Sequence, residues 1–169
     1  MFINTNKTTL IIFGSRAMVS KVEDFRPTLF RKEIAPTTFA KDLGVILDSC
    51  LMYNNHIALT VSGCMASLGQ INRVKHAFDT TTLTIIIYAL VFSKRYYCCN
   101  VWSNTSEHSL NEIQAVQNFA ARIVSGSKKY HHISPILNDL RWLPVRQQLY
   151  YHHAIMALNV WLGVHHTLY

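Results

Sequence analysis

The chain has 169 residues, of which half are hydrophobic and only 15% are charged, and this composition excludes a disordered polymer. Sixteen Lys and Arg against nine Asp and Glu give a formal net charge of +7, which favours polyanions or acidic surfaces as partners. The longest apolar run, Leu83–Phe92, is too short to span a bilayer, and the sequence opens without a secretory signal. We therefore expect a soluble, intracellular protein with no membrane partner.

The first third of the chain predicts short strands. Residues 9–13 predict a buried strand that ends at Gly14, and residues 27–34 predict a hairpin that turns at Arg31-Lys32. Residues 40–48 predict a further strand. An interior strand needs neighbours on both edges, and little sequence precedes residue 9 to supply them. We therefore expect a fragment whose first strand leaves apolar side chains partly uncovered.

From residue 54 the pattern changes to helices. Apolar residues recur at three- and four-residue steps over residues 57–74, which predicts one amphipathic helix. Residues 83–92 are apolar on all sides and predict a buried helix, with Asp79 among its candidate N-caps. Residues 106–126 predict a third helix that stops at Gly126.

Two further helices are expected after this stop. A short one follows Ser134-Pro135, with Pro at its first position, and a long one runs from Pro144 to near Gly163. The predicted fold class is α+β, with a small antiparallel β unit followed by a bundle of four to five α-helices. The predicted domains are residues 1–53 and residues 54–169.

Several segments match a known pattern when they are taken in order. They include "AKDLGVILDSCLMYNNHI", "IQAVQNFAARIVSG" and "HISPILNDLRWLPVRQQLYY". In this order and spacing they resemble the C-terminal part of reverse transcriptases from non-LTR retrotransposons, the LINE elements of the jockey kind. The resemblance implies a palm remnant with a primer-grip-like segment over residues 1–53, and a thumb and connection region over residues 54–169. The rest of the palm and the fingers would then be missing partners.

The catalytic acids of such a polymerase are not found in the sequence. Reverse transcriptases hold two Mg²⁺ ions with an aromatic-x-Asp-Asp hairpin, which this chain lacks. Glu23-Asp24 is predicted to lie in a solvated turn, and Asp42 and Asp48 would lie about 20 Å apart on one strand. We expect no catalytic residue, no metal site, no cofactor and no small-molecule substrate, because the Mg²⁺ would belong to the missing palm.

Histidine and cysteine offer little alternative chemistry. Histidines occur as adjacent pairs at 131–132, 152–153 and 165–166, and adjacent helical side chains diverge by about 100°, which disfavours a shared zinc ion. The four cysteines form no C-x-x-C motif and are expected to be reduced and mostly buried, with Cys98-Cys99 packing at a helix end.

The excess of basic residues favours contact with nucleic acid. Basic residues concentrate in the helical part with aromatic residues nearby, a combination typical of nucleic-acid binding; the alternative is a solvated basic surface. By resemblance, Lys7 would lie near the incoming triphosphate; the alternative is an exposed turn lysine. Trp142 is expected to be a packing anchor. The candidate binding residues are Lys7, Arg73, Lys75, Gln114, Asn118, Arg122, Lys128, Lys129, Arg141 and Arg146.

One helix face is predicted to carry much of this binding. Gln114, Asn118 and Arg122 form an i, i+4 row that is expected to face solvent, and Lys128-Lys129 follow it directly. The leading hypothesis is a catalytically incomplete reverse-transcriptase fragment that binds an RNA/DNA template–primer. The alternative is a basic helical protein-interaction module with no nucleic-acid role, and the salt dependence of binding separates the two.

Overall fold

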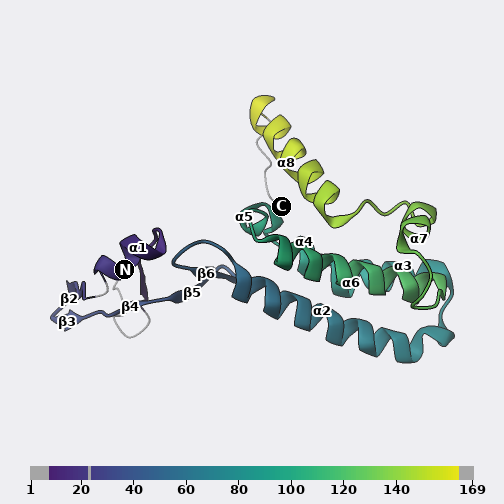
Figure 1. Ribbon diagram of the computed structural model, residues 1–169, viewed down its shortest axis with the longest axis horizontal. Helices are drawn as coiled ribbons and strands as arrows, with labels where there is room; N and C mark the ends of the chain where they lie inside the picture. The colour runs from purple at the N-terminus through teal and green to yellow at the C-terminus, as the bar shows by residue number, and fades with distance from the viewer. Residues whose placement is uncertain (1–7, 23, 164–169) are drawn as a thin grey trace. The chain divides into compact units, whose positions relative to one another are not determined.

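The computed structural model describes residues 8–22 and 24–163, so Lys7 and the His165-His166 pair lie outside the described residues. The chain divides into two compact units, Met1–His56 and Ile57–Tyr169, which we name the strand unit and the helical unit. The α+β class predicted from sequence is confirmed, because short strands precede a set of helices (Figure 1).

The strand unit consists of three separate two-stranded sheets. β2–β3 and β5–β6 are antiparallel, whereas β1–β4 is parallel, a pairing that the sequence reading did not anticipate. The predicted hairpin over residues 27–34 is present. The elements are β1 (Leu10–Ile11), α1 (Arg16–Val19), the 3-10 turn η1 (Ser20–Val22), β2 (Thr28–Leu29), β3 (Lys32–Glu33), β4 (Pro36–Thr37), β5 (Phe39–Asp42) and β6 (Val45–Asp48).

Residues 39–48 form a hairpin, and the prediction of a single strand there was wrong. Leu43 and Gly44 both have left-handed backbone, with φ of 43° and 87°, as a two-residue type I′ turn requires. Leucine is rare in that conformation, so the apolar run concealed the turn. Asp42 pairs with Val45 and Asp48 pairs with Phe39, so the two carboxylates lie at opposite ends of the hairpin.

Leu43→Asn should stabilise the strand unit. The Leu43 side chain is 83% exposed and loses little burial when it is replaced, while asparagine tolerates left-handed backbone. We expect the free energy of unfolding to rise by about 0.5 to 1 kcal/mol, measured by urea denaturation. Leu43→Val is the control and should lower it, because a β-branched residue resists positive φ. Equal stability of the two variants would contradict the turn.

Asp48 organises the loop that leads into the first long helix. Its carboxylate accepts backbone N–H bonds from Cys50 at 3.0 Å, Met52 at 3.1 Å and Tyr53 at 2.6 Å. Near the helix start, His56 Nδ1 accepts the N–H of Ile46 at 3.4 Å, and burial lowers the pKa of His56. Asp48 therefore has a structural role.

The strand unit buries few side chains. Among its described residues only Val45, Tyr53 and His56 are buried. Leu10 and Ile11 of β1 are half-buried, and Phe13 just after it is exposed. Further exposed aromatic side chains are those of Phe25, Phe30 and Phe39.

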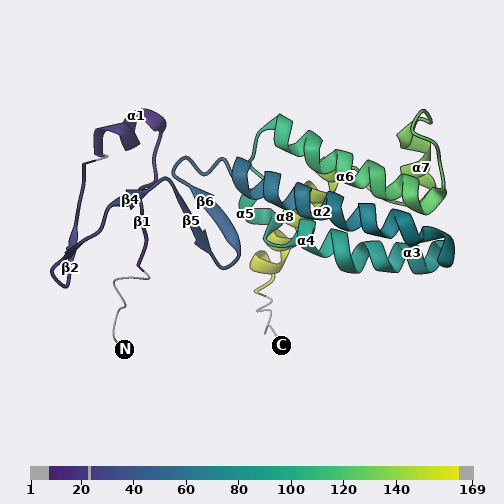
Figure 2. The same cartoon turned by 90° about the horizontal axis from the view of Figure 1, so that it is seen from below.

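The helical unit contains longer elements, and α2, α3 and α6 lie side by side around one core (Figure 2). No helix in the described part of the chain is long and apolar enough to cross a membrane. The elements are α2 (Asn54–Val74), the 3-10 turn η2 (Lys75–Ala77), α3 (Thr80–Ile87), the π-helical turn η3 (Tyr88–Phe92), α4 (Ser93–Tyr96), α5 (Cys99–Trp102), α6 (Glu107–Ser125), α7 (Ile133–Asp139) and α8 (Val145–Trp161).

Helix ends follow local capping chemistry. Asp79 is the N-cap of α3, as predicted, and accepts the N–H of Thr81 at 3.2 Å; hydrogen bonds from Thr82 and the backbone lower the pKa of Asp79. Gly126 ends α6 in the predicted left-handed conformation, with φ of 67°. α7 begins at Ile133, so Pro135 does not take its first position, which corrects the prediction.

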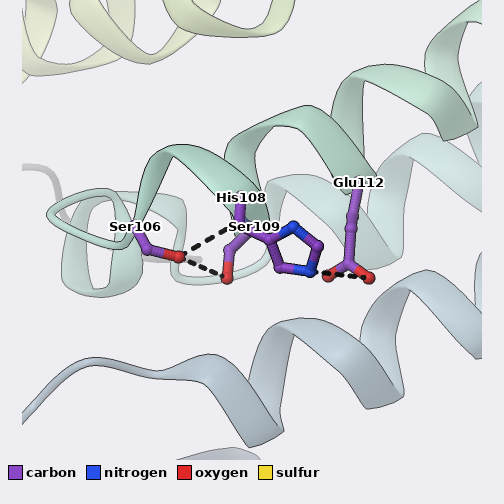
Figure 3. Close-up of polar contacts among 4 residues, drawn as sticks. All are labelled: Ser106, His108, Ser109 and Glu112. Atoms are coloured by element: carbon purple, nitrogen blue, oxygen red, sulfur yellow. Dashed lines mark hydrogen bonds and ion pairs between the residues drawn. The ribbon is translucent and has the colours of Figure 1, made fainter.

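The start of α6 is fixed by polar contacts on its first turns (Figure 3). Ser106 is the N-cap, and its hydroxyl oxygen accepts the backbone N–H of Ser109 at 3.2 Å. One turn later His108 Nε2 lies 3.7 Å from a carboxylate oxygen of Glu112. The Ser106 hydroxyl thus satisfies one of the amides that the first helical turn leaves without an intrahelical partner, whereas the His108–Glu112 contact joins two side chains one turn apart.

The core of the helical unit is formed mainly by α2, α3, α6 and α7. Trp142 belongs to it, with its ring centroid 4.9 Å from that of Phe92, so its predicted role as a packing anchor is confirmed. The segment 83–92 buries one face only. Leu83 and Ile87 are buried while Ile85 and Leu90 are exposed, so the prediction of burial on all sides was wrong.

The π-helical turn explains why buried side chains in this segment are spaced four residues apart. Buried residues recur every four positions along this helix, at Leu83, Ile87, Val91 and Arg95. In a regular α-helix each four-residue step rotates the side chain by about 40°, so a run of such steps leaves the core face. The wider turn at Tyr88–Phe92 holds more residues and keeps the later positions on the same face.

Candidate nucleic-acid interface

A recess of about 350 Å³ lies where the C-terminal parts of α2 and α6 meet. Three cations predicted to bind nucleic acid line it together, and no acidic residue of the described ranges does. Such a site attracts anions, because its positive charges are not neutralised locally. We name it the basic groove; its residues are Asn72, Lys75, Phe119, Arg122, Ile123, Ser127 and Lys129.

Local structure places each cation of the groove. Lys75 lies in η2 just after α2, and Arg122 lies in the last turn of α6. The left-handed residue Gly126 then turns the chain, so that Ser127 and Lys129 return to the groove. Phe119 adds an apolar wall.

Arg122 is partly held by its own helix. Its Nη1 donates to the Asn118 carbonyl oxygen at 3.4 Å, while its buried Nε has no hydrogen-bond partner among the described residues. Arg73 and Lys128 are exposed and neighbour groove residues in sequence. The geometry thus brings together Lys75, Arg122 and Lys129.

Gln114 and Asn118 do not form the free solvent-facing row predicted from periodicity. Gln114 Nε2 donates to Asn118 Oδ1 at 2.9 Å and to Gln117 Oε1 at 3.0 Å, while Gln114 Oε1 accepts the N–H of Val145 at 2.8 Å. Val145 is the first residue of α8, whose N-cap Pro144 offers no side-chain bond. Gln114 therefore caps α8 from another helix.

Arg141 and Arg146 lie away from the basic groove. Arg146 forms an ion pair and hydrogen bond with Glu107, which raises the pKa of Arg146. It lines a separate recess, where Ser103 Oγ lies 2.8 Å from His153 Nε2. Ser103 also donates to the Asn100 carbonyl oxygen at 3.2 Å, which commits its hydroxyl proton and argues against a nucleophile. Arg141 lines a third recess.

Arg95 belongs to the basic residues of the helical part, and sequence reasoning, which counted those residues as surface cations, missed its burial. Arg95 is 2% exposed, and its Nη2 donates to Gln148 Oε1 at 2.6 Å. Its guanidinium lies 4.4 Å from the ring centroid of Phe92 and 4.6 Å from that of Tyr96. Burial lowers the pKa of Arg95. The four-residue spacing of buried positions was the signal that could have revealed it.

Metal and thiol chemistry find no support in the described ranges. No group of three or more His, Cys, Asp or Glu gathers around a point there. All four cysteines are free, and burial raises the pKa of the Cys64 and Cys99 thiols, which keeps them protonated and unreactive.

Comparison with known proteins gives two matches, both from Drosophila melanogaster. The chain is 24% identical over 118 residues to "Probable RNA-directed DNA polymerase from transposon X-element", covering 68% of this chain and 13% of that protein. It is 26% identical over 132 residues to "Probable RNA-directed DNA polymerase from transposon BS", covering 70% of this chain and 15% of that protein. No family model matches, and no solved structure matches.

The two relatives are much longer than the chain, which spans about an eighth to a seventh of their length. Their agreement in kind matters more than either identity value, since both are RNA-directed DNA polymerases of transposons. Together with the ordered sequence motifs, these matches support the conclusion that the chain contains a region related to the reverse transcriptases of transposons.

Proposed function

We propose that the chain is the C-terminal palm, thumb and connection part of a non-LTR retrotransposon reverse transcriptase, and that it holds a template–primer duplex without polymerising. The basic groove carries this proposal. Lys75, Arg122 and Lys129 come from different segments, share one recess and have no acidic neighbour in it. Phosphate oxygens are the ligands that such a cluster of cations fits.

The composition of the strand unit is consistent with a piece of a larger polymerase. Its described residues form only two-stranded sheets and leave several phenylalanines exposed. Large apolar side chains left exposed on a unit with so small a core are surface that another part of a protein can cover. The fingers and the rest of the palm would be that part, and they would supply the carboxylates that bind Mg²⁺.

A triple variant tests the groove. Lys75→Ala with Arg122→Ala and Lys129→Ala should remove up to three phosphate contacts. Each contact contributes about 0.9 to the slope of log affinity against log salt, so the slope should become shallower by roughly 2 to 3. Fluorescence anisotropy with a labelled RNA–DNA duplex at several salt concentrations measures it. The loss should be similar for unrelated sequences, because phosphate contacts carry no base information.

The matched control removes the same charge elsewhere. Arg31→Ala with Lys32→Ala and Lys41→Ala takes three exposed cations from the strand unit and should leave most of the slope unchanged. If both triple variants lose the same slope, the binding follows net charge and the groove is not the site. If the groove variant binds as tightly as wild type at low salt, the proposal fails.

One observation favours the alternative of a protein-interaction module. The C-terminal half of α8 carries several exposed apolar side chains. In that case binding of the chain to its partner would be insensitive to salt. The exposed residues are Ile155, Met156, Leu158, Val160 and Trp161.

A further inference from the structure

A recess of about 300 Å³ in the helical unit is lined mainly by aromatic rings. Its volume lies at the lower end of small-molecule sites. Five rings and one cation form most of its wall, and none of the acidic residues that the structure describes lines it. We name it the aromatic pocket; these residues are Tyr88, Tyr96, Trp142, Tyr151, His152 and Arg141.

The rings are packed against one another at steep angles. The Tyr88 and Trp142 centroids are 5.9 Å apart with an interplanar angle of 84°, and those of Tyr96 and His152 are 5.3 Å apart at 59°. Trp142 is buried, whereas Tyr88 and Tyr151 are exposed and leave ring surface open to solvent. A planar ligand can therefore reach aromatic faces that the protein does not cover.

The aromatic pocket lies between α8 and α4, which hydrogen bonds of Gln148 connect. Gln148 of α8 lines it and accepts hydrogen bonds at Oε1 from Arg95 and from the Tyr96 hydroxyl, at 2.6 and 3.0 Å. Gln148 Nε2 donates to the Leu143 carbonyl oxygen at 2.7 Å. Because these bonds fix α8 against the preceding helices, the ring positions are preorganised for binding.

Arg141 lies directly after the end of α7, at the position where glycine is most common. The Arg141 N–H donates to the Asn138 carbonyl at 2.9 Å and the Trp142 N–H donates to the Leu137 carbonyl at 2.8 Å, the two bonds of a Schellman motif after α7. Arg141 has φ of 55° at the residue where glycine is usual. Arg141 is exposed at this position and lines the aromatic pocket, so its guanidinium is accessible to an anionic ligand there.

We propose that the aromatic pocket accepts one unpaired nucleobase of a single-stranded segment, stacked on Tyr151 and Tyr88, with Arg141 contacting the phosphate of that strand. The inference rests on the proposed function, because it adds a stacking site to a nucleic-acid-binding unit. Stacking on aromatic side chains is how proteins hold unpaired bases, and it tolerates any base sequence.

The test compares two adjacent tyrosines on α8. Tyr151 is 58% exposed and lines the pocket, whereas Tyr150 is 63% exposed and lines a different recess. Tyr151→Ala should weaken binding of a labelled mixed-sequence RNA single strand about tenfold, and Tyr150→Ala should leave it unchanged. Tyr151→Phe should bind as wild type, because it retains the ring. Affinity for a fully paired duplex should not change in any of them.

The salt dependence separates stacking from charge. Tyr151→Ala should keep the salt slope of wild type, whereas Arg141→Gly should make it shallower by about 0.7 and raise the unfolding temperature. The inference is overturned if Tyr151→Ala binds as tightly as wild type, or if Tyr151→Phe binds as weakly as Tyr151→Ala. If either outcome occurs while the triple variant of the basic groove still shows the shallower salt slope, only the stacking site is disproved. If wild type binds no nucleic acid at low salt, the proposed function fails first.

Discussion

Phe92→Ala should lower the free energy of unfolding of the helical unit by about 3 to 5 kcal/mol. The Phe92 side chain is fully buried, and its ring contacts those of Trp142, Tyr88 and Tyr96, with centroids 4.9, 5.0 and 6.2 Å away. It also lies under the Arg95 guanidinium. Truncation removes all of these contacts and leaves a cavity among rigid rings. Urea denaturation followed by far-UV circular dichroism measures the loss.

Leu90→Ala is the matched control, since Leu90 lies in the same π-helical turn but is 52% exposed. Its effect should stay within about 0.5 kcal/mol of wild type. Losses of similar size at the two positions would contradict the one-sided burial of this turn.

Gln148→Ala should lower the free energy of unfolding by about 3 kcal/mol. The variant removes the acceptor of Arg95 Nη2 and of the Tyr96 hydroxyl, and it also removes one donor to the Leu143 carbonyl. The buried Arg95 guanidinium would then lose its amide acceptor, while its Nε and Nη1 already have no partner in the described structure. Thermal and urea unfolding report the change.

Two further variants test whether the lost acceptor of Arg95 causes the destabilisation by Gln148→Ala. Gln147→Ala changes the exposed neighbour of Gln148 and should be nearly neutral. Arg95→Met combined with Gln148→Leu replaces the donor and its acceptor with apolar side chains, so most of the lost stability should return. A double variant as unstable as Gln148→Ala would show that the lost acceptor of Arg95 is not responsible.

The start of α3 and the end of α6 could be predicted because their capping chemistry is local, whereas the start of α7 was misplaced. Asp79 and Gly126 act within a few residues of their own position, on backbone groups that every helix leaves unpaired. The hairpin at Leu43 could not be predicted, because it depends on a leucine in a conformation that pairing with the neighbouring strand imposes. Lys7, in turn, lies outside the described residues and stays a prediction.

In the candidate site, too, local features could be predicted from the sequence, whereas features that depend on packing could not. The sequence placed Lys75, Arg122 and Lys129 among the binding residues, but it could not show that they share one recess, which depends on how α2 and α6 pack. Periodicity placed Gln114 on the polar side of α6 but could not show that the start of α8 covers it. Arg95 was misread because a charged residue is expected at the surface, whereas the packing of α8 supplies its acceptor.

The π-helical turn at Tyr88–Phe92 also fixes the register of the helix that passes through it. If this turn tightened to α-helical form, the residues after it would rotate by about 100° relative to those before it. Arg95 would then leave Gln148, and the ring of Tyr96 would leave the aromatic pocket. A change of register would therefore break the Gln148 hydrogen bonds and the aromatic pocket at the same time. The hydrogen bonds of Gln148 thus stabilise both the π-helical turn and the pocket.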